Sequence, residues 1–189
     1  MIGMNCKHKS KISNLSDKGA DIMFNENKNK GKLITISGSP AGAVETVIKL
    51  LTTKHENYKT WVITTTRQRR MDEVFGDLEE ENYCFVSREE FEKRIDENQF
   101  IEYSSYAGNY YGTSKEEVFL QLKNGINVIL EVSYETAHKI KEKYTDAIEV
   151  GIISSETQMY PVSNVDILIV NQNPEETADY LVKKIEFGS

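Results

Sequence analysis

Apolar and polar residues follow two alternating patterns along most of the chain. Short β-branched runs such as LITIS (33–37) and NVILEV (127–132) predict buried strands, whereas AVETVIKLLTT (43–53) has its apolar residues at helical spacing. The remaining expected strands are 60–66, 147–153 and 165–170, and the remaining expected helices are 87–98, 114–125, 133–144 and 173–187. Strands that alternate with helices predict parallel β-α-β units, so we expect an α/β fold with a doubly wound parallel sheet.

Two segments depart from this alternation. Residues 67–113 carry short strands and one helix, and QFIEYSSYAGNYYGT (99–113) alternates around a turn, which predicts a hairpin. We therefore expect a small inserted lobe at about 67–113. Residues 1–31 are rich in Lys, Asn, Ser and Asp and poor in large apolar residues, which is typical of a disordered or weakly ordered tail. The folded domain is expected to span residues 32–187.

Composition narrows the classes of function. The net charge of −7 argues against nonspecific binding of nucleic acid. No apolar run is long enough to span a membrane, and the first residues lack the hydrophobic core of a signal peptide, so we expect a cytoplasmic protein without a membrane partner. Cys6 and Cys84 lie far apart in unlike contexts and the histidines are scattered, so neither a disulfide framework nor a metal site is expected.

The segment ISGSPAGAVET (36–46) lies between a strand and a helix, where a phosphate-binding loop would be. The loop motif is G-x-x-x-x-G-K-[ST]. Aligned from Gly38, the chain has Ala43 for the second glycine, Val44 for the lysine and Glu45 for the hydroxyl residue. Val44 brings no charge to a phosphate, and Glu45 places a carboxylate in the first turn of the helix, where it suits the helix dipole and repels phosphate. The motif alone favours a plain strand–turn–helix.

Three later segments change this interpretation. They are TTRQRRMDEVFG (65–76), YCFVSREEFEKRIDENQFIEY (83–103) and AGNYYGTSKEEV (107–118). Together they resemble the guanylate kinase family, and the resemblance extends in order over nearly all of residues 32–187. It implies a P-loop kinase type of fold in which the inserted lobe is similar to a GMP-binding lobe.

The resemblance implies a binding role for seven positions, which are Arg67, Arg70, Glu73, Tyr83, Glu102, Tyr111 and Thr113. The arginines match residues that grip the GMP phosphate, and their planar guanidinium groups suit bidentate contact. The two tyrosines match residues whose hydroxyls contact the same phosphate, and Glu73 matches an acidic residue of the lobe. Glu102 and Thr113 match residues that read the guanine edge.

The chain also departs from the family pattern within these segments. Arg69 stands where the family has a proline, and Glu131 and Ser133 stand where it has a pair of aspartates. The second aspartate helps to bind guanine in the family, so the change bears on guanine selectivity. Glu131 has two open interpretations, as the acidic end of a magnesium site or as an ordinary glutamate at a strand end.

The largest departure follows the expected strand at 147–153. The family has an arginine-rich helical lid there, but only SSETQMYPVSN (154–164) precedes the next strand, and all the arginines lie before residue 95. Phosphoryl transfer depends on positioning and on stabilising charge, and an arginine at the transition state is worth about 10³–10⁵ in rate. The lid is therefore interpreted as deleted. The chain lacks the loop lysine, the loop hydroxyl and the lid arginines together, and these three losses argue against catalysis.

Three hypotheses follow for the function. The first is a catalytically inactive protein that retains a pocket for GMP or for a phosphorylated residue of a protein ligand. The alternative is an active but divergent guanylate kinase that transfers phosphate from ATP to GMP and needs ATP and magnesium. The third is a purely structural domain, which we rank last because the departures concentrate at the donor-nucleotide side.

Overall fold

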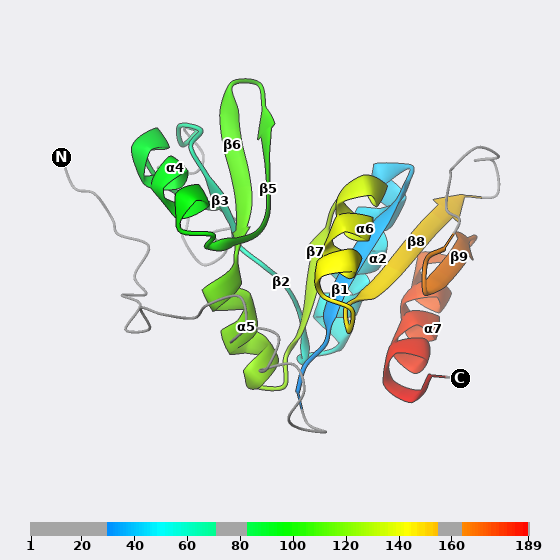
Figure 1. The fold of residues 1–189 in the computed structure, drawn as a ribbon. Helices are drawn as coiled ribbons and strands as arrows, with labels where there is room; N and C mark the ends of the chain where they lie inside the picture. The colour runs from blue at the N-terminus through cyan, green and yellow to red at the C-terminus, as the bar shows by residue number, and fades with distance from the viewer. Residues whose placement is uncertain (1–29, 71–82, 155–163, 189) are drawn as a thin grey trace. The chain divides into compact units, whose positions relative to one another are not determined.

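The computed structural model describes residues 30–70, 83–154 and 164–188. Within these residues the chain divides into two compact units. The smaller unit contains the described part of Val62–Glu117, and the larger unit contains the described residues before Val62 and after Glu117. Figure 1 shows the elements of both units.

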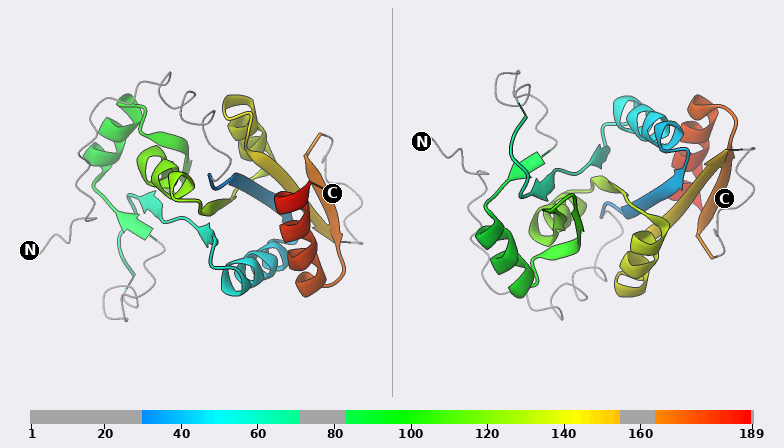
Figure 2. Two further views of the ribbon diagram at one scale, coloured as in Figure 1. Left: turned by 90° about the horizontal axis from the view of Figure 1, so that it is seen from below. Right: turned by 90° about the horizontal axis from the view of Figure 1, so that it is seen from above.

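The larger unit is built on a five-stranded sheet. Its strands, in spatial order, are β2 (Tyr58–Thr60), β7 (Asn127–Glu131), β1 (Leu33–Ser39), β8 (Ile148–Ser154) and β9 (Ile167–Asn171). Every neighbouring pair is parallel. Helices α2 (Ala41–Lys54) and α7 (Pro174–Phe187) cover one face, and α6 (Tyr134–Lys143) covers the other (Figures 1 and 2). The predicted doubly wound parallel sheet is confirmed.

The core of the larger unit lies between the sheet and the α2–α7 pair. Ile34 and Ile36 of β1 point into it, together with Val47 of α2 and Leu181 of α7, and all are fully buried. Each such side chain stabilises the fold by about 1.5–3 kcal/mol relative to an exposed position. The alternation of β1 places Thr35 on the opposite face of the sheet, so both faces of this strand are buried.

The smaller unit is a four-stranded sheet with one helix on it. Its strands are β4 (Tyr83–Phe85), β3 (Ile63–Thr65), β6 (Asn109–Ser114) and β5 (Phe100–Tyr106) in spatial order. The predicted hairpin is the antiparallel pair β5–β6. Helix α4 (Arg88–Asp96) packs against this sheet through Phe91, whose ring centroid lies 4.4 Å from that of Phe100 and 5.2 Å from that of Tyr110. Helix α5 (Lys115–Lys123) follows β6.

Two expectations are wrong. The predicted strand at 60–66 is two short strands in different sheets, because β2 pairs with β7 whereas β3 pairs with β4 and β6. A continuous β-branched run cannot reveal that its two halves find different partners. Cys84 is buried, and, although no disulfide framework was expected, it is disulfide-bonded; its partner is not among the described residues.

Helix length and polarity bear on membrane insertion. Among the described residues, every helix is too short or too polar to cross a bilayer. The structure leaves the expected tail of residues 1–31 almost entirely undescribed, so its disorder stays a prediction. Lys30 and Gly31 are described, and the Gly31 N–H donates to the Leu122 carbonyl at 2.8 Å.

Candidate functional site

Four of the expected binding residues lie on one face of the small sheet. In the strand register Glu102 is opposite Thr113 and Tyr111 is opposite Thr65. Side chains two positions apart share a face, and directly paired residues share it too, so Thr113 and Tyr111 lie on the same side as Glu102. The parallel pairing of Ile63 with Tyr83 extends this side onto β4. We call this surface the binding face.

The opposite face of the small sheet is closed. A Cβ added at Gly112 would lie 3.0 Å from atoms of both the Phe91 and Phe100 side chains. This glycine therefore lets α4 approach the sheet closely. Tyr110 belongs to this covered face, and its hydroxyl accepts a hydrogen bond from Arg88 Nη2 at 3.1 Å. The two tyrosines of the sequence NYYG thus have different roles, since Tyr110 packs under α4 and Tyr111 faces away from it.

Glu102 and Thr113 form a polar pair on the binding face. The Thr113 hydroxyl donates to Glu102 Oε1 at 2.8 Å, and Thr113 itself is buried. Burial raises the pKa of the Glu102 carboxyl, and the Thr113 hydrogen bond opposes this shift. The carboxylate is held in one orientation, where it can accept hydrogen bonds from the N–H groups of a base edge.

Arg67 brings positive charge to the same surface. Its guanidinium carbon lies 4.6 Å from the ring centroid of Tyr83 and 5.1 Å from that of Phe85, so the side chain stacks on β4. Its backbone N–H donates to Thr65 Oγ1 at 3.2 Å. Arg69, the residue at the family's proline position, lies 4.4 Å above the Phe85 ring. Two guanidinium groups therefore stack on the aromatic residues of β4.

Arg70 and Glu73 are less well placed by the structure. Arg70 is described and exposed, and its expected role stays a prediction. Glu73 lies outside the described residues, so its expected role stays a prediction.

Thr65 and Thr66, to which the sequence analysis gave no role, bind the backbone of Tyr110 through their side chains. Thr65 Oγ1 donates to the Tyr110 carbonyl at 2.8 Å, and the Tyr110 N–H donates to Thr66 Oγ1 at 2.9 Å. These bonds fix the start of the arginine-bearing loop beside β6. Consecutive threonines before Arg67 were the only sequence signal, and they did not reveal a partner 44 residues away.

The expected phosphate loop has a different form in the structure. Strand β1 ends at Ser39 and α2 begins at Ala41, so Pro40 alone separates them. The N–H groups of Ala43 and Val44 donate to the Pro40 carbonyl at 3.0 and 3.4 Å. Backbone groups that would cradle a phosphate in a wider loop are here part of the first helical turn.

Val44, at the position of the motif lysine, is a core residue. Its side chain is 1% exposed. A Cβ added at Gly38 would lie 2.8 Å from Val44 Cγ2 and 2.0 Å from the Ile152 carbonyl oxygen, so β1, β8 and α2 meet closely at this point. A lysine here would have to enter the core or displace the helix.

Glu45 is exposed, but it does not lie in the first turn as expected. Because α2 begins at Ala41, the first turn contains no acidic residue and Glu45 lies in the second. Glu131 is the last residue of β7. Partial burial raises the pKa of its carboxyl, and the negative charge of Glu45 raises it further. Within the described residues no group of three or more His, Cys, Asp or Glu side chains could hold a metal ion.

The expected loss of the lid concerns residues that the structure leaves largely undescribed. Strand β8 ends at Ser154 and β9 begins at Ile167, and residues 155–163 between them are not described. The absence of lid arginines therefore rests on the sequence.

Comparisons with known proteins agree with this architecture. A family model described as guanylate kinase matches residues 30–163. A guanylate kinase of Clostridium perfringens is 43% identical over 125 residues, which is 66% of this chain and 56% of the relative. A guanylate kinase of Prochlorococcus marinus is 30% identical over 186 residues, which is 84% of this chain and 99% of the relative. The match thus spans little more than half of the first relative and almost all of the second.

A solved structure gives the same result. The crystal structure of guanylate kinase from Anaplasma phagocytophilum superposes with a TM-score of 0.60 at 26% identity, over 82% of this chain and 84% of that one. The family model covers more than half of this chain, and a full-length relative aligns over most of it. This chain belongs to the guanylate kinase family.

Proposed function

We propose that this chain binds GMP, or a phosphorylated residue of a protein ligand, on the binding face of its small sheet and does not transfer phosphate from ATP. The observation that carries the proposal is the position of Val44. The residue at the position of the loop lysine is instead buried in the core of the larger unit. Four of the residues expected to bind the monophosphate share one face of the sheet in the smaller unit, and they are Tyr83, Glu102, Tyr111 and Thr113.

The binding face offers suitable chemistry for an acceptor ligand. The stacked guanidinium of Arg67 can make two parallel hydrogen bonds to phosphate oxygens. The oriented carboxylate of Glu102 can accept from the N–H groups of guanine, with its position fixed by Thr113. A phosphorylated side chain would use the arginine and tyrosine contacts and leave Glu102 for other donors of the ligand.

The donor side lacks the groups that phosphoryl transfer needs. Val44 brings no positive charge to the position of the loop lysine, and the nearby carboxylates of Glu45 and Glu131 would repel a triphosphate. Arginine at the transition state contributes about 10³–10⁵ in rate, and the sequence has none after Arg94. We therefore expect neither ATP nor magnesium as a cofactor. The net charge of −7 separately argues against a nucleic-acid partner.

An active kinase is the second candidate function. The curated relatives are named guanylate kinase, and the identity of 43% over 125 residues favours this alternative. In that case ATP and magnesium would be required, and a cation from elsewhere would have to take the place of the lysine.

Calorimetric titrations of GMP and of ATP with magnesium, run beside a coupled kinase assay, separate the two. We expect GMP to bind, and Arg67→Ala to weaken that binding by about tenfold or more, since a hydrogen bond to a charged group contributes about 1.5–3 kcal/mol. Arg88→Ala is the matched control, because Arg88 lies beside Tyr110 on the covered face. Turnover at an ordinary kinase rate would refute inactivity. Failure of wild-type protein to bind either GMP or a phosphopeptide at millimolar concentration would refute the pocket.

A further inference from the structure

Strand β9 forms an edge of the five-stranded sheet. Among the described residues it pairs on one side only, with β8, from Ile167 beside Val150 to Asn171 beside Ser154. Its sequence, ILIVN, has no charged residue and no proline. Sheet edges are usually protected by charge, proline or a covering segment, because an open edge invites pairing with another strand. Strand β9 has neither a charged residue nor a proline to protect its edge.

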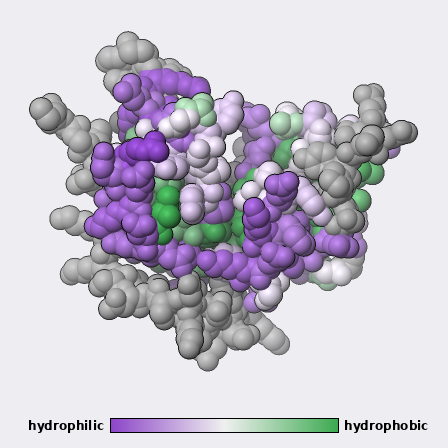
Figure 3. Space-filling view, turned by 45° about the horizontal axis from the view of Figure 1, so that its top comes forward, coloured by the Kyte–Doolittle hydropathy of each residue, from purple (hydrophilic) through white to green (hydrophobic). Residues whose placement is uncertain are grey.

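Large apolar side chains are exposed along this edge. Leu168 and Val170 are each 48% exposed and lie on one face of β9, while Ile169 between them is in the core. Gly151 is the neighbour of Leu168 on β8, so no β8 side chain covers that position. Hydrophobic residues reach the surface on the side of Figure 3 where β9 and α7 lie.

Helix α7 adds aromatic side chains next to this strand. Tyr180 is 45% exposed and Phe187 is 74% exposed, and a spacing of seven residues places them on one side of the helix. Four of the seven exposed large hydrophobic side chains of the described chain come from β9 and α7. Because α7 packs on the face of β9 that carries Ile169, Tyr180 and Phe187 belong to one face of the sheet and Leu168 and Val170 to the other, so apolar side chains are exposed on both faces beside this edge.

We propose that β9 pairs with β9 of a second copy of this chain, in antiparallel orientation, to form a continuous sheet across a twofold axis. Pairing centred on Ile169 places Leu168 of one copy beside Val170 of the other, so the exposed apolar side chains cover each other. A twofold interface uses the same patch on both copies, and an apolar strand that reads similarly in both directions meets this requirement.

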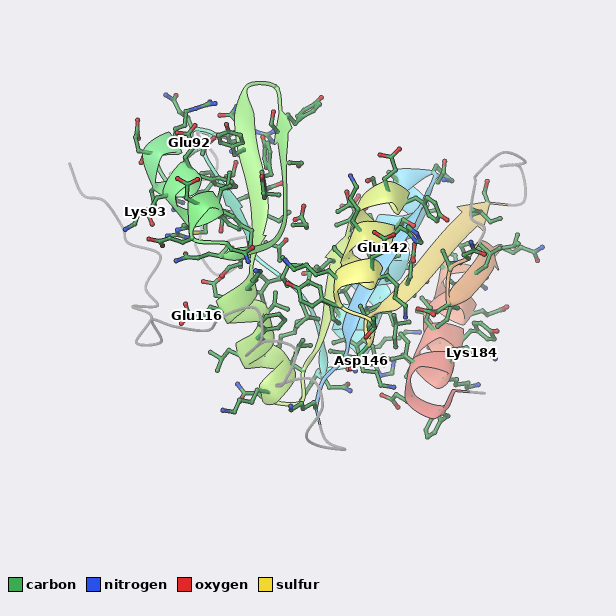
Figure 4. All side chains as sticks on the ribbon, in the orientation of Figure 1. Glu92, Lys93, Glu116, Glu142, Asp146 and Lys184 are labelled. Atoms are coloured by element: carbon green, nitrogen blue, oxygen red, sulfur yellow. The ribbon has the colours of Figure 1, made fainter. Side chains whose placement is uncertain are left out.

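The charges of α7 favour the same partner. The helix begins with Glu175 and Glu176 and has Lys184 in its last turn, where Figure 4 labels it. The antiparallel pairing of two β9 strands sets the two α7 helices in opposite directions on the same face of the sheet. The acidic start of one helix then faces the basic end of the other, which is complementary, whereas a parallel arrangement would oppose like charges.

Sedimentation velocity of the full chain, from about 1 to about 100 µM, tests the proposal. We expect a monomer–dimer equilibrium whose dissociation constant rises by about tenfold or more in Leu168→Lys. Leu120→Lys is the matched control, because Leu120 is 45% exposed on α5, away from β9 in sequence. A wild-type chain that stays monomeric throughout, or a dimer that Leu120→Lys weakens as much as Leu168→Lys does, overturns the proposal.

Hydrogen exchange of the wild-type chain keeps the test independent of any variant. We expect the amides of β9 to become more protected as protein concentration rises. Protection that is already complete at the lowest concentration, in a monomer, would mean that another segment of the same chain covers the strand, and would also overturn the proposal.

Discussion

Restoring the motif lysine with Val44→Lys should destabilise the protein without giving it ATP binding. Val44 is 1% exposed and touches the position where Gly38 and Ile152 meet. Losing the burial of the valine costs about 1.5–3 kcal/mol. The lysine ammonium must then be buried without a partner, at a cost of several kcal/mol, or reach solvent by moving the first turns of α2.

The sum, at least about 4 kcal/mol, is a large part of the roughly 5–15 kcal/mol that stabilises a typical domain. Urea unfolding measures it as a fall in the transition midpoint at constant slope. Val44→Ala supplies one control, since it creates a cavity without a charge and should cost less. Glu45→Lys supplies the other, because it places a lysine at the neighbouring exposed position and should change stability by about 0.5 kcal/mol or less.

A Val44→Lys protein that is as stable as the wild type and gains affinity for ATP in calorimetry would contradict this prediction. That result would mean that residue 44 can face a phosphate and that the segment 38–46 is an open loop in solution.

Other predictions concern single residues. Glu149 is 1% exposed, and both of its carboxylate oxygens lack a hydrogen-bond partner. Burial is the main cause that raises the pKa of this carboxyl above the ordinary 4.5. His138, whose Nδ1 lies 3.7 Å from Glu149 Oε2, opposes the shift. Glu149→Gln should therefore increase the free energy of unfolding by about 1 kcal/mol at neutral pH, and the gain should shrink as the pH falls toward 4.5; a gain that grows on acidification in pH-dependent urea unfolding would contradict this. Gly112→Ala should cost about 1–3 kcal/mol in thermal or urea unfolding, because its Cβ would press on Phe91 and Phe100, whereas Gly42→Ala, with nothing within 4 Å, should be neutral or stabilising; equal effects would show that α4 does not pack as described.

The spacing of apolar and polar residues predicted most of the helices and strands, because this spacing is a local property of the sequence. The alternation in 99–113 predicted the β5–β6 hairpin, and Ser87, the first residue of the expected helix 87–98, caps α4 by accepting a hydrogen bond from the Glu90 N–H at 3.1 Å. The start of α2 was misplaced because glycine and alanine around Gly42 suggested a loop, whereas the helix begins directly after Pro40. The expected strand at 60–66 crosses the boundary between the two units, which lies after Trp61, and no local feature of the sequence marks this boundary.

The candidate site was predicted only in part for a related reason. The family resemblance supplied Tyr83, Glu102 and Tyr111, but only the strand register shows that they share a face. The bonds of Thr65 and Thr66 to Tyr110 join segments far apart in the sequence, and no spacing rule anticipates them. Val44 likewise belongs to a core cluster that includes Ile152 of β8, so the sequence showed that the lysine is absent but not that the position is part of the core.

The most direct test of the central claim is a coupled assay of the purified chain with saturating GMP, ATP and magnesium, on a sample whose GMP binding has been measured by calorimetry. The account predicts that GMP binds and that no GDP forms above the uncatalysed background. Formation of GDP at about 1–100 per second, the ordinary range for kinases, would contradict it.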